Sequence, residues 1–136
     1  MHGLPLRLTP GCDLRRELER SVGEGSATGG FVVSGIGSLT QASLRFAAVD
    51  AATLIVEPLE LLTLAGSLTP DGAHLHALVA TADGRVIGGH VGYGCIVRTT
   101  AEILVAMLPD WRLGRAHDPA SGYAELTIAR PDAADG

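Results

Sequence analysis

The sequence predicts an α+β fold with a central, mainly antiparallel β-sheet and one or two flanking helices. Three observations support this fold class. Short apolar or alternating runs recur along most of the chain and are separated by turn residues, as expected for paired strands. One amphipathic segment near the start has the spacing of a helix. Glycine is abundant, at 18 residues, while aromatic residues make up only 4%, which suits closely packed strands joined by tight turns.

The length and composition indicate one domain. A chain of 136 residues with 46% hydrophobic residues can bury one sizeable core and is too short for two full domains. We expect this domain to extend over residues 4–128. Residues 129–136 are polar and lack core-forming side chains, so we expect a loose C-terminal tail there.

The first two elements are a strand and a helix. Residues 4–8, with the sequence LPLRL, form a short apolar run that the following TPG stops. Asp13 is then in position to cap the N-terminus of a helix, which Gly23 or Gly25 could end. Three residues with helical spacing form the apolar stripe of this helix: Leu14, Leu18 and Val22.

Strand-like runs follow the helix as far as the end of the domain. They contain β-branched residues or alternate between apolar and polar side chains, and turn residues separate them. The runs cover residues 29–39, 42–49, 53–68, 73–81, 85–100 and 123–128. The segment 99–108, TTAEILVAML, fits either a second helix or a further strand, and we favour the strand.

The charge distribution argues against a broad nucleic-acid interface. The net charge is −5, and all 10 basic residues are arginine, with no lysine. Sequence-independent binding to DNA draws on clustered Lys and Arg, so any DNA contact would have to be local. Arginine instead favours planar, bidentate contacts with individual acidic groups.

The targeting and cysteine patterns predict a cytoplasmic protein. The N-terminus, MHGLPLRLTPG, has neither the basic start nor the continuous apolar core of a signal peptide, and no window is apolar enough to span a bilayer. Cys12 and Cys95 lie far apart, and two thiols make a poor disulfide framework for a domain of this size. We therefore expect a reducing compartment and no membrane partner.

Three of the 5 histidines lie in one short segment, HLHALVATADGRVIGGH, which runs from His74 to His90. On a strand, His74 and His76 point to the same face because successive side chains alternate. Register decides whether His90 joins them. A three-residue loop over 82–84 places His76 opposite His90, whereas a two-residue loop places His90 on the other face. A bulge at residues 88–89 would also shift the alignment.

In the favourable register the three histidines form a candidate metal site. Three imidazoles on one face could converge on a divalent ion, and zinc suits this ligand type best, although nickel, copper and iron also accept imidazole. Three protein ligands would leave a fourth position open for water, a ligand or a residue of another subunit. The alternative is that the histidines form an ordinary polar face of the strand.

From about residue 4 to residue 128 the sequence resembles the PPC domain, also called the DUF296 or PD1-like DNA-binding domain. The blocks that carry the resemblance are RLTPGCDL, VVSGIGSLTQASLR, LTLAGSLTPDGAHLHALVATADGRVIGGHVGYGCIVRTTAEI and DPASGYAEL. The resemblance implies a mainly antiparallel sheet, favours the strand for 99–108, and implies assembly as a homotrimer. It also implies a metal, usually taken as zinc, on His74, His76 and His90.

The same resemblance raises DNA as a candidate partner. Members of this family occur alone in bacteria and archaea and fused to AT-hooks in plant nuclear proteins. The AT-hook, an Arg-Gly-Arg-Pro core that inserts into the minor groove, is what reads DNA in the plant members. This chain has no such motif, and its nearest phrase, ARPDAADG, continues with acids. The charge and the missing motif therefore argue against DNA.

Further residues near the histidine segment are candidates for binding a ligand or an anion. Glycines there would give an ion or ligand close access to the backbone. Arginines there could bind an anion, or could form ordinary ion pairs at the surface or between subunits. Glu102 could act as a general base if it approached the metal. The candidates are Arg85, Gly88, Gly89, Arg98 and Glu102, with Arg45 as a further arginine.

Three functions are consistent with these features. The leading one is a metal-binding, homotrimeric binding or regulatory module of the PPC type, with DNA as its candidate partner. The second is a zinc-dependent enzyme whose open three-histidine site activates water or polarises a small substrate. The third is a trimeric scaffold without catalysis, in which the histidines are polar packing.

Overall fold

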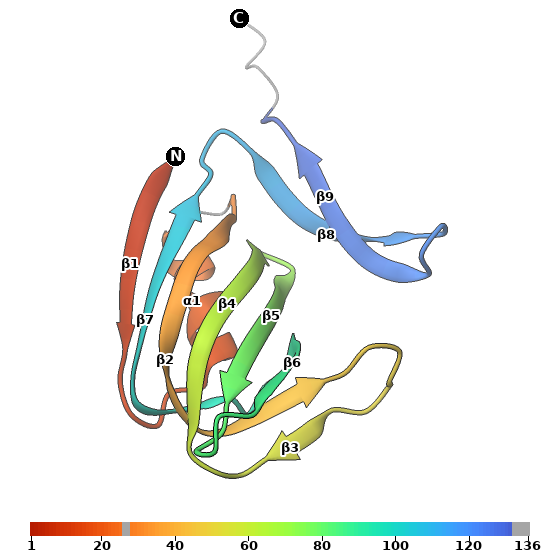
Figure 1. The fold of residues 1–136 in the computed structure, drawn as a ribbon. Coiled ribbons are helices and arrows are strands. Elements are labelled where there is room, and N and C mark those ends of the chain that lie inside the picture. The colour runs from red at the N-terminus through yellow and green to blue at the C-terminus, as the bar shows by residue number, and fades with distance from the viewer. Residues whose placement is uncertain (26–27, 132–136) are drawn as a thin grey trace, which may run out of the picture.

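The protein is built from antiparallel strands with one helix packed against them (Figure 1). The computed structural model describes residues 1–25 and 28–131. Within these residues the elements are β1 (His2–Leu8), α1 (Leu14–Gly25), β2 (Gly30–Arg45), β3 (Thr53–Ile55), β4 (Leu59–Thr69), β5 (Gly72–Ala80), β6 (Val86–Val91), β7 (Ile96–Met107), β8 (Arg112–Asp118) and β9 (Tyr123–Ala129). The predicted mainly antiparallel sheet is confirmed, and the described residues contain one flanking helix. In the same residues no helix has the length and hydropathy needed to cross a bilayer.

The main sheet closes on itself at one end. Its strands run in the order β1-β7-β2-β4-β5-β6, all in antiparallel pairs, and β3 pairs with β2. β2 also pairs with β6, through Leu44 with Val91 and Arg45 with His90, so that β2, β4, β5 and β6 form a closed ring. β2 can pair with β3, β4, β6 and β7 because it is 16 residues long and irregular. Its register with β7 shifts at three points, and such shifts bend a strand.

Helix α1 covers the inner side of the sheet. Asp13 caps it, because its Oδ1 accepts a hydrogen bond from the backbone N–H of Arg16 at 3.2 Å. The helix contacts β4, β5 and β7. Its apolar stripe is at most 1% exposed and consists of the three predicted residues, Leu14, Leu18 and Val22. Because a helix of 12 residues is marginal alone, this burial, roughly 1.5–3 kcal/mol per side chain, is what stabilises it.

The ambiguous segment 99–108 is a strand, as favoured from the sequence. It belongs to β7, which ends at Met107 and lies between β1 and β2. Alternate residues point into the core, which is the period of a strand and not of a helix. The inward residues are at most 6% exposed: Ala101, Ile103, Val105 and Met107.

A second, two-stranded sheet follows the main one. β8 and β9 pair along their whole length and stand apart from the main sheet in Figure 1. Only β9 was predicted from the sequence, because β8 reads RLGRAHD and has few apolar residues. Leu113 attaches this hairpin to the rest of the protein: its side chain is 5% exposed, and its N–H donates to the carbonyl of Thr28 at 2.9 Å. Residue 129, assigned to the tail, is the last residue of β9, and residues 132–136 lie outside the described part.

The β5–β6 hairpin has the three-residue loop that sets the favourable register. Thr81 donates its N–H to the carbonyl of Arg85 at 2.9 Å, and Gly84 donates to the carbonyl of Thr81 at 3.0 Å. Gly84 has a φ of 83°, the left-handed conformation expected at this position. Pairing continues without a shift as far as His76, which lies opposite His90. Of the two alignments left open by the sequence, the structure therefore has the one that brings His90 to the face of His74 and His76.

Replacing Gly84 with alanine should lower the free energy of unfolding by about 1–2 kcal/mol, because an L-residue is strained in the left-handed conformation. No atom lies within 4 Å of the added Cβ, so the cost is conformational and not a clash. Urea denaturation measures the change. Gly23→Ala is the control, because Gly23 lies in α1 with equally open space and alanine there should stabilise by up to about 1 kcal/mol. Equal stabilities of the two variants would contradict this reasoning.

Candidate metal centre

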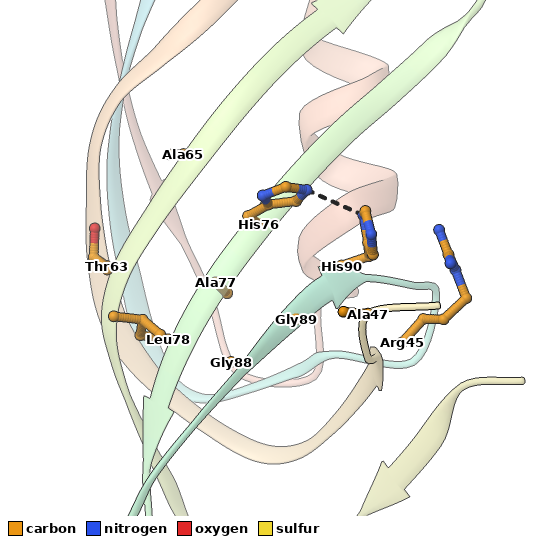
Figure 2. Close-up of a pocket in the computed structure, with 10 residues that line it drawn as sticks. All are labelled: Arg45, Ala47, Thr63, Ala65, His76, Ala77, Leu78, Gly88, Gly89 and His90. Atoms are coloured by element: carbon orange, nitrogen blue, oxygen red, sulfur yellow. Dashed lines mark hydrogen bonds between the residues drawn. The ribbon is translucent and has the colours of Figure 1, made fainter. Parts of the chain in front are cut away.

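The three predicted histidines meet on the solvent-facing side of the closed ring. Leu75 and Ala77, which alternate with the histidines of β5, are at most 5% exposed, so the strand directs His74 and His76 away from the core. His76 Nε2 lies 3.2 Å from His74 Nε2 and 3.0 Å from His90 Nδ1, and Figure 2 shows the latter contact. The ligand nitrogens of the three rings all lie within 4.8 Å of one another.

The spacing of these nitrogens fits a metal ion. Two ligands at about 2.0–2.1 Å from a tetrahedral zinc ion are about 3.3 Å apart. The two short separations in the cluster, 3.2 and 3.0 Å, are close to that value. Hydrogen bonds alone satisfy the cluster poorly, because His76 Nε2 has one in-plane proton or one lone pair and faces two nitrogens. A cation that shares three lone pairs removes this conflict.

Gly89 allows β2 and β6 to close the ring beside His90. A Cβ on Gly89 would lie 2.8 Å from the carbonyl oxygen of Arg45, a contact that only a backbone shift could relieve. Arg45 is the residue of β2 that pairs with His90. On the other side of the cluster, β4 places the small Ala65 opposite His76, which leaves room for the rings.

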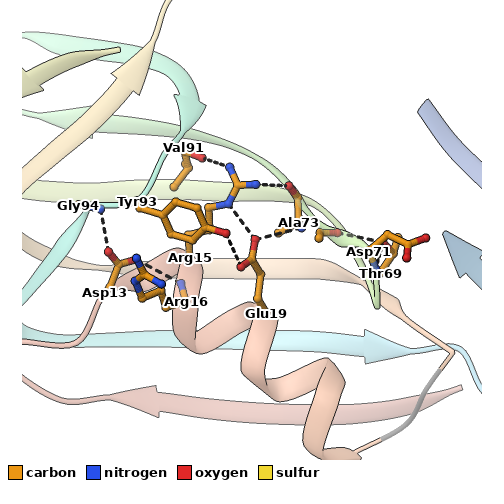
Figure 3. A network of polar contacts seen from close by, with 11 residues as sticks. Asp13, Arg15, Arg16, Glu19, Thr69, Asp71, Ala73, Val91, Tyr93 and Gly94 are labelled. Carbon is orange, nitrogen blue, oxygen red and sulfur yellow. Dashed lines mark hydrogen bonds and ion pairs between the residues drawn. The ribbon is translucent and has the colours of Figure 1, made fainter. Parts of the chain in front are cut away.

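Arg15 of α1 holds the backbone of both strands that carry the cluster (Figure 3). Its guanidinium donates hydrogen bonds to the carbonyls of Ala73 and Val91, each at 3.0 Å. Ala73 precedes His74 and Val91 follows His90, so one side chain ties together the backbone beside two of the three histidines. Sequence reasoning missed Arg15, because an arginine on an amphipathic helix resembles an ordinary surface residue.

Glu19 holds Arg15 in this position. Its Oε1 accepts hydrogen bonds from Arg15 Nε at 2.9 Å and from the backbone N–H of Ala73 at 3.3 Å, and its Oε2 accepts one from the Tyr93 hydroxyl at 2.7 Å (Figure 3). Burial alone would raise the pKa of Glu19, but the hydrogen bonds from Tyr93, Arg15 and Ala73 outweigh it and lower this pKa below its usual value. Glu19 is therefore ionised at neutral pH and pairs with Arg15.

The surroundings keep two of the imidazoles neutral. Burial, followed by the charges of His76 and Arg115, lowers the pKa of His74. Burial, followed by the charges of Arg45 and His76, lowers the pKa of His90. A histidine binds a metal through a lone pair, so rings that are neutral at pH 7 are ready to do so.

The metal-free protein should lose stability as the pH falls from about 7 to about 5. The pKa values of His74 and His90 are lowered in the folded chain, so below the unfolded pKa of about 6.5 the unfolded chain binds more protons. Stability is therefore complete above that pH and declines below it. Urea unfolding in the presence of a chelator measures this decline. A His74→Gln, His90→Gln variant should show a smaller decline, and an unchanged one would contradict the assignment.

Gly88 and Gly89, predicted as ligand-contacting residues, lie beside the cluster. They line a cavity of about 370 Å³ together with His76, His90 and Arg45 (Figure 2). In Figure 2, the side chain of Arg45 extends alongside His90. The space that a Cβ would occupy is already filled, by the Leu78 side chain at Gly88 and by the Arg45 carbonyl at Gly89.

The other predicted residues lie away from the histidines. Arg85 is 66% exposed and pairs with Asp83 at 3.1 Å in the hairpin loop. Arg98 and Glu102 line a separate cavity of about 510 Å³, and among the described residues that line it there is no histidine. The reason is the strand order, which places β2 and β4 between β7 and β5. Within one chain, Glu102 therefore does not face the histidine cluster.

Two charged residues near the cluster come from the β8–β9 hairpin and were missed. Arg115 on β8 and Glu125 on β9 both act electrostatically on His74. They line a cavity of about 600 Å³ that His74 and His90 also line. Arg115 gave no signal because β8 was not recognised, and although β9 was predicted, the packing of the hairpin beside His74 depends on contacts distant in sequence.

Known proteins share both the sequence and the fold of this chain. A model of the Plants and Prokaryotes Conserved (PCC) domain matches residues 1–109. The bifunctional protein GlmU of Synechococcus sp. (strain JA-2-3B'a(2-13)) is 52% identical over 131 residues, which are 96% of this chain. The chain spans only 21% of the length of that relative.

Solved structures extend the likeness to nearly the whole chain. A hypothetical protein from Salmonella enterica is 35% identical with a TM-score of 0.92, over 95% of this chain and 94% of that one. A metal-containing protein from Archaeoglobus fulgidus is 28% identical with a TM-score of 0.79, over 93% of this chain and 94% of that one. The family model ends before β8, whereas these structures cover most of the β8–β9 hairpin as well.

Proposed function

The chain belongs to the Plants and Prokaryotes Conserved domain family, and from this premise we propose that it is a metal-binding module that holds one divalent ion on His74, His76 and His90. The observation that carries the proposal is the pair of 3.2 and 3.0 Å contacts to His76 Nε2, which suit a shared cation better than hydrogen bonds. The metal-containing relative from Archaeoglobus fulgidus supports it.

We propose zinc as the ion, because it accepts imidazole ligands in a tetrahedral arrangement. When bound, it would polarise an oxygen atom of a ligand at its fourth position. The residues of the chain itself orient and prepare the site: Arg15 and Glu19 hold the strands, and Arg45 and Arg115 favour neutral imidazoles. Glu102 lies in another cavity, so a catalytic base would have to be a different acid, such as Glu125, which lines the cavity beside His74 and His90.

Elemental analysis of protein purified without a histidine tag tests the metal proposal. We expect close to one zinc ion per chain, removable by a chelator and restored on adding zinc. A chain that carries no metal and takes up none would contradict the proposal and favour the scaffold hypothesis. Zinc-edge anomalous scattering would then locate the ion, which we expect within about 2.0–2.1 Å of one nitrogen from each histidine.

We also propose a homotrimer, in which the outer face of the sheet is covered by neighbouring subunits. Large apolar side chains are exposed on four neighbouring strands, β2, β4, β5 and β7, and contact between subunits would remove them from water. These side chains are Phe31, Val33, Ile36, Leu62, Leu78 and Leu104, with exposures from 39 to 59%. Light scattering should give three times the chain mass of 14.0 kDa. The mass of one chain would contradict the trimer.

Duplex DNA is not the ligand that we propose. The net charge of −5 leaves no broad cationic surface to neutralise phosphates. We therefore expect no gel shift with duplex DNA at about physiological salt. A shift that survives this salt and depends on DNA sequence would contradict the expectation and restore DNA as the partner.

A further inference from the structure

We propose that the cavity between the histidine cluster and the β8–β9 hairpin binds a small carboxylate or phosphate, held by Arg45 and Arg115. The cavity measures about 600 Å³, which lies within the range of small-molecule sites. Arg45 and Arg115 line this cavity together with His74 and His90, and Arg45 is the β2 residue that pairs with His90. This proposal gives the class of ligand that would bind beside the proposed metal site. The presence of the ion rests on the proposed function, whereas the anion site rests on the two arginines.

Arg115 is held in place and keeps unused donors. Its Nη2 donates to Ser67 Oγ at 2.6 Å, and its backbone N–H donates to Asp71 Oδ2 at 3.0 Å. Burial lowers the pKa of Arg115, as expected for a charge partly removed from water. A guanidinium has five N–H donors, and the contact with Ser67 uses one, which leaves donors for the two oxygens of a carboxylate or phosphate.

Arg45 also keeps donors for a ligand. Its Nη1 donates to the carbonyl of Val49 at 3.3 Å, a long contact for a hydrogen bond. In the described part of the chain the arginines that form ion pairs are Arg15, Arg20 and Arg85, and neither Arg45 nor Arg115 is among them. Glu125 and Asp71 act on Arg115 without forming an ion pair with it, so both guanidinium groups keep donors that an added anion could accept.

The charge balance of the cavity favours an anion when the metal is bound. Arg15 also lines the cavity, but its ion pair with Glu19 neutralises it. Asp71 and Glu125 offset the two remaining arginines. A divalent ion on the histidines would then leave the site with a net positive charge. An anion should therefore bind the zinc-loaded protein more tightly than the metal-free protein.

Calorimetric titration of the zinc-loaded protein with malonate and, separately, with inorganic phosphate tests the proposal. We expect a dissociation constant in the millimolar range or below for at least one of them, and the tighter one identifies the preferred acidic group. Arg45→Met and Arg115→Met should each weaken this binding about tenfold or more. Arg112→Met is the control, because Arg112 is exposed on β8 outside the lining of the cavity, and it should bind the anion as the unmodified protein does.

Unchanged affinity in both cavity variants, or no binding of either anion at millimolar concentration, would overturn the proposal. Titration of the metal-free protein distinguishes failure of the anion site from failure of the metal site. If the chain takes up no metal but still binds the anion through its arginines, the anion site is supported and the metal proposal is not. Cobalt-loaded protein gives an independent readout through its visible spectrum. Equal spectral changes on adding anion to the unmodified protein and to both variants would show that the ion alone holds the anion, and the arginine site would be wrong.

Discussion

Replacing His76 with alanine should abolish metal binding, with a loss of affinity greater than about 100-fold. His76 is the central ligand, since its Nε2 makes both short contacts of the cluster, at 3.2 Å to His74 and 3.0 Å to His90. Without His76, only two histidine ligands remain, which is one fewer than a three-histidine site needs. Competition with a chromophoric chelator measures the affinity, and elemental analysis measures the metal content.

His117→Ala is the matched control, because it removes an exposed histidine on β8 outside the cluster. It should bind metal as the unmodified protein does. His76 is exposed, so its replacement should leave the fold of the metal-free protein intact, which circular dichroism would verify. A folded His76→Ala protein that keeps its zinc would contradict the three-histidine site.

Replacing Arg15 with methionine should weaken metal binding by about 10–100-fold, although Arg15 does not touch the ion. Its guanidinium holds the carbonyls of Ala73 and Val91, the backbone neighbours of His74 and His90. Without these bonds the ends of β5 and β6 are free to move apart. The free energy of unfolding should also fall by roughly 1–3 kcal/mol, because charge-assisted hydrogen bonds are lost.

Arg20→Met provides the comparison, because Arg20 lies on the same helix and its side chain is 58% exposed in an ion pair with Glu17. That exposed pair should contribute less than about 1 kcal/mol, and its loss should leave metal affinity unchanged. Metal titrations at a temperature where both variants are folded show whether Arg15 positions the histidine ligands or only stabilises the fold. If Arg15→Met lowers stability but keeps full metal affinity, Arg15 supports the fold and does not position the ligands.

The histidine cluster could be predicted from the sequence because its geometry is local. The alternation of β5 puts His74 and His76 on one face, and the Asp83-Gly84 turn places His90 on the next strand; the sequence left two loop lengths open, and the three-residue loop that occurs sets His76 opposite His90. The α1 stripe was predicted for the same reason, since an N-cap and a helical period lie within a few residues of each other. Both features depend on residues that are close together in the sequence.

The surroundings of the cluster could not be predicted in this way. Arg15 reaches Val91 across 76 positions of the sequence, and Arg115 reaches Ser67 across 48. β8 has little apolar patterning, so the hairpin that carries Arg115 left no signal. Glu102 and Arg98 looked close to the histidines in sequence, but the order of strands in the sheet separates them from the cluster.

The sequence by itself determined most of the strand pattern, the helix and the shared face of His74 and His76, because side-chain alternation acts between near neighbours. It left His90 open between two loop lengths, and the structure decided its pairing with His76. Only the tertiary structure decided what faces that cluster: the closing of the ring through Arg45 and the approach of the β8–β9 hairpin. These depend on how sheets bend and pack over long separations in the chain, which no local pattern specifies.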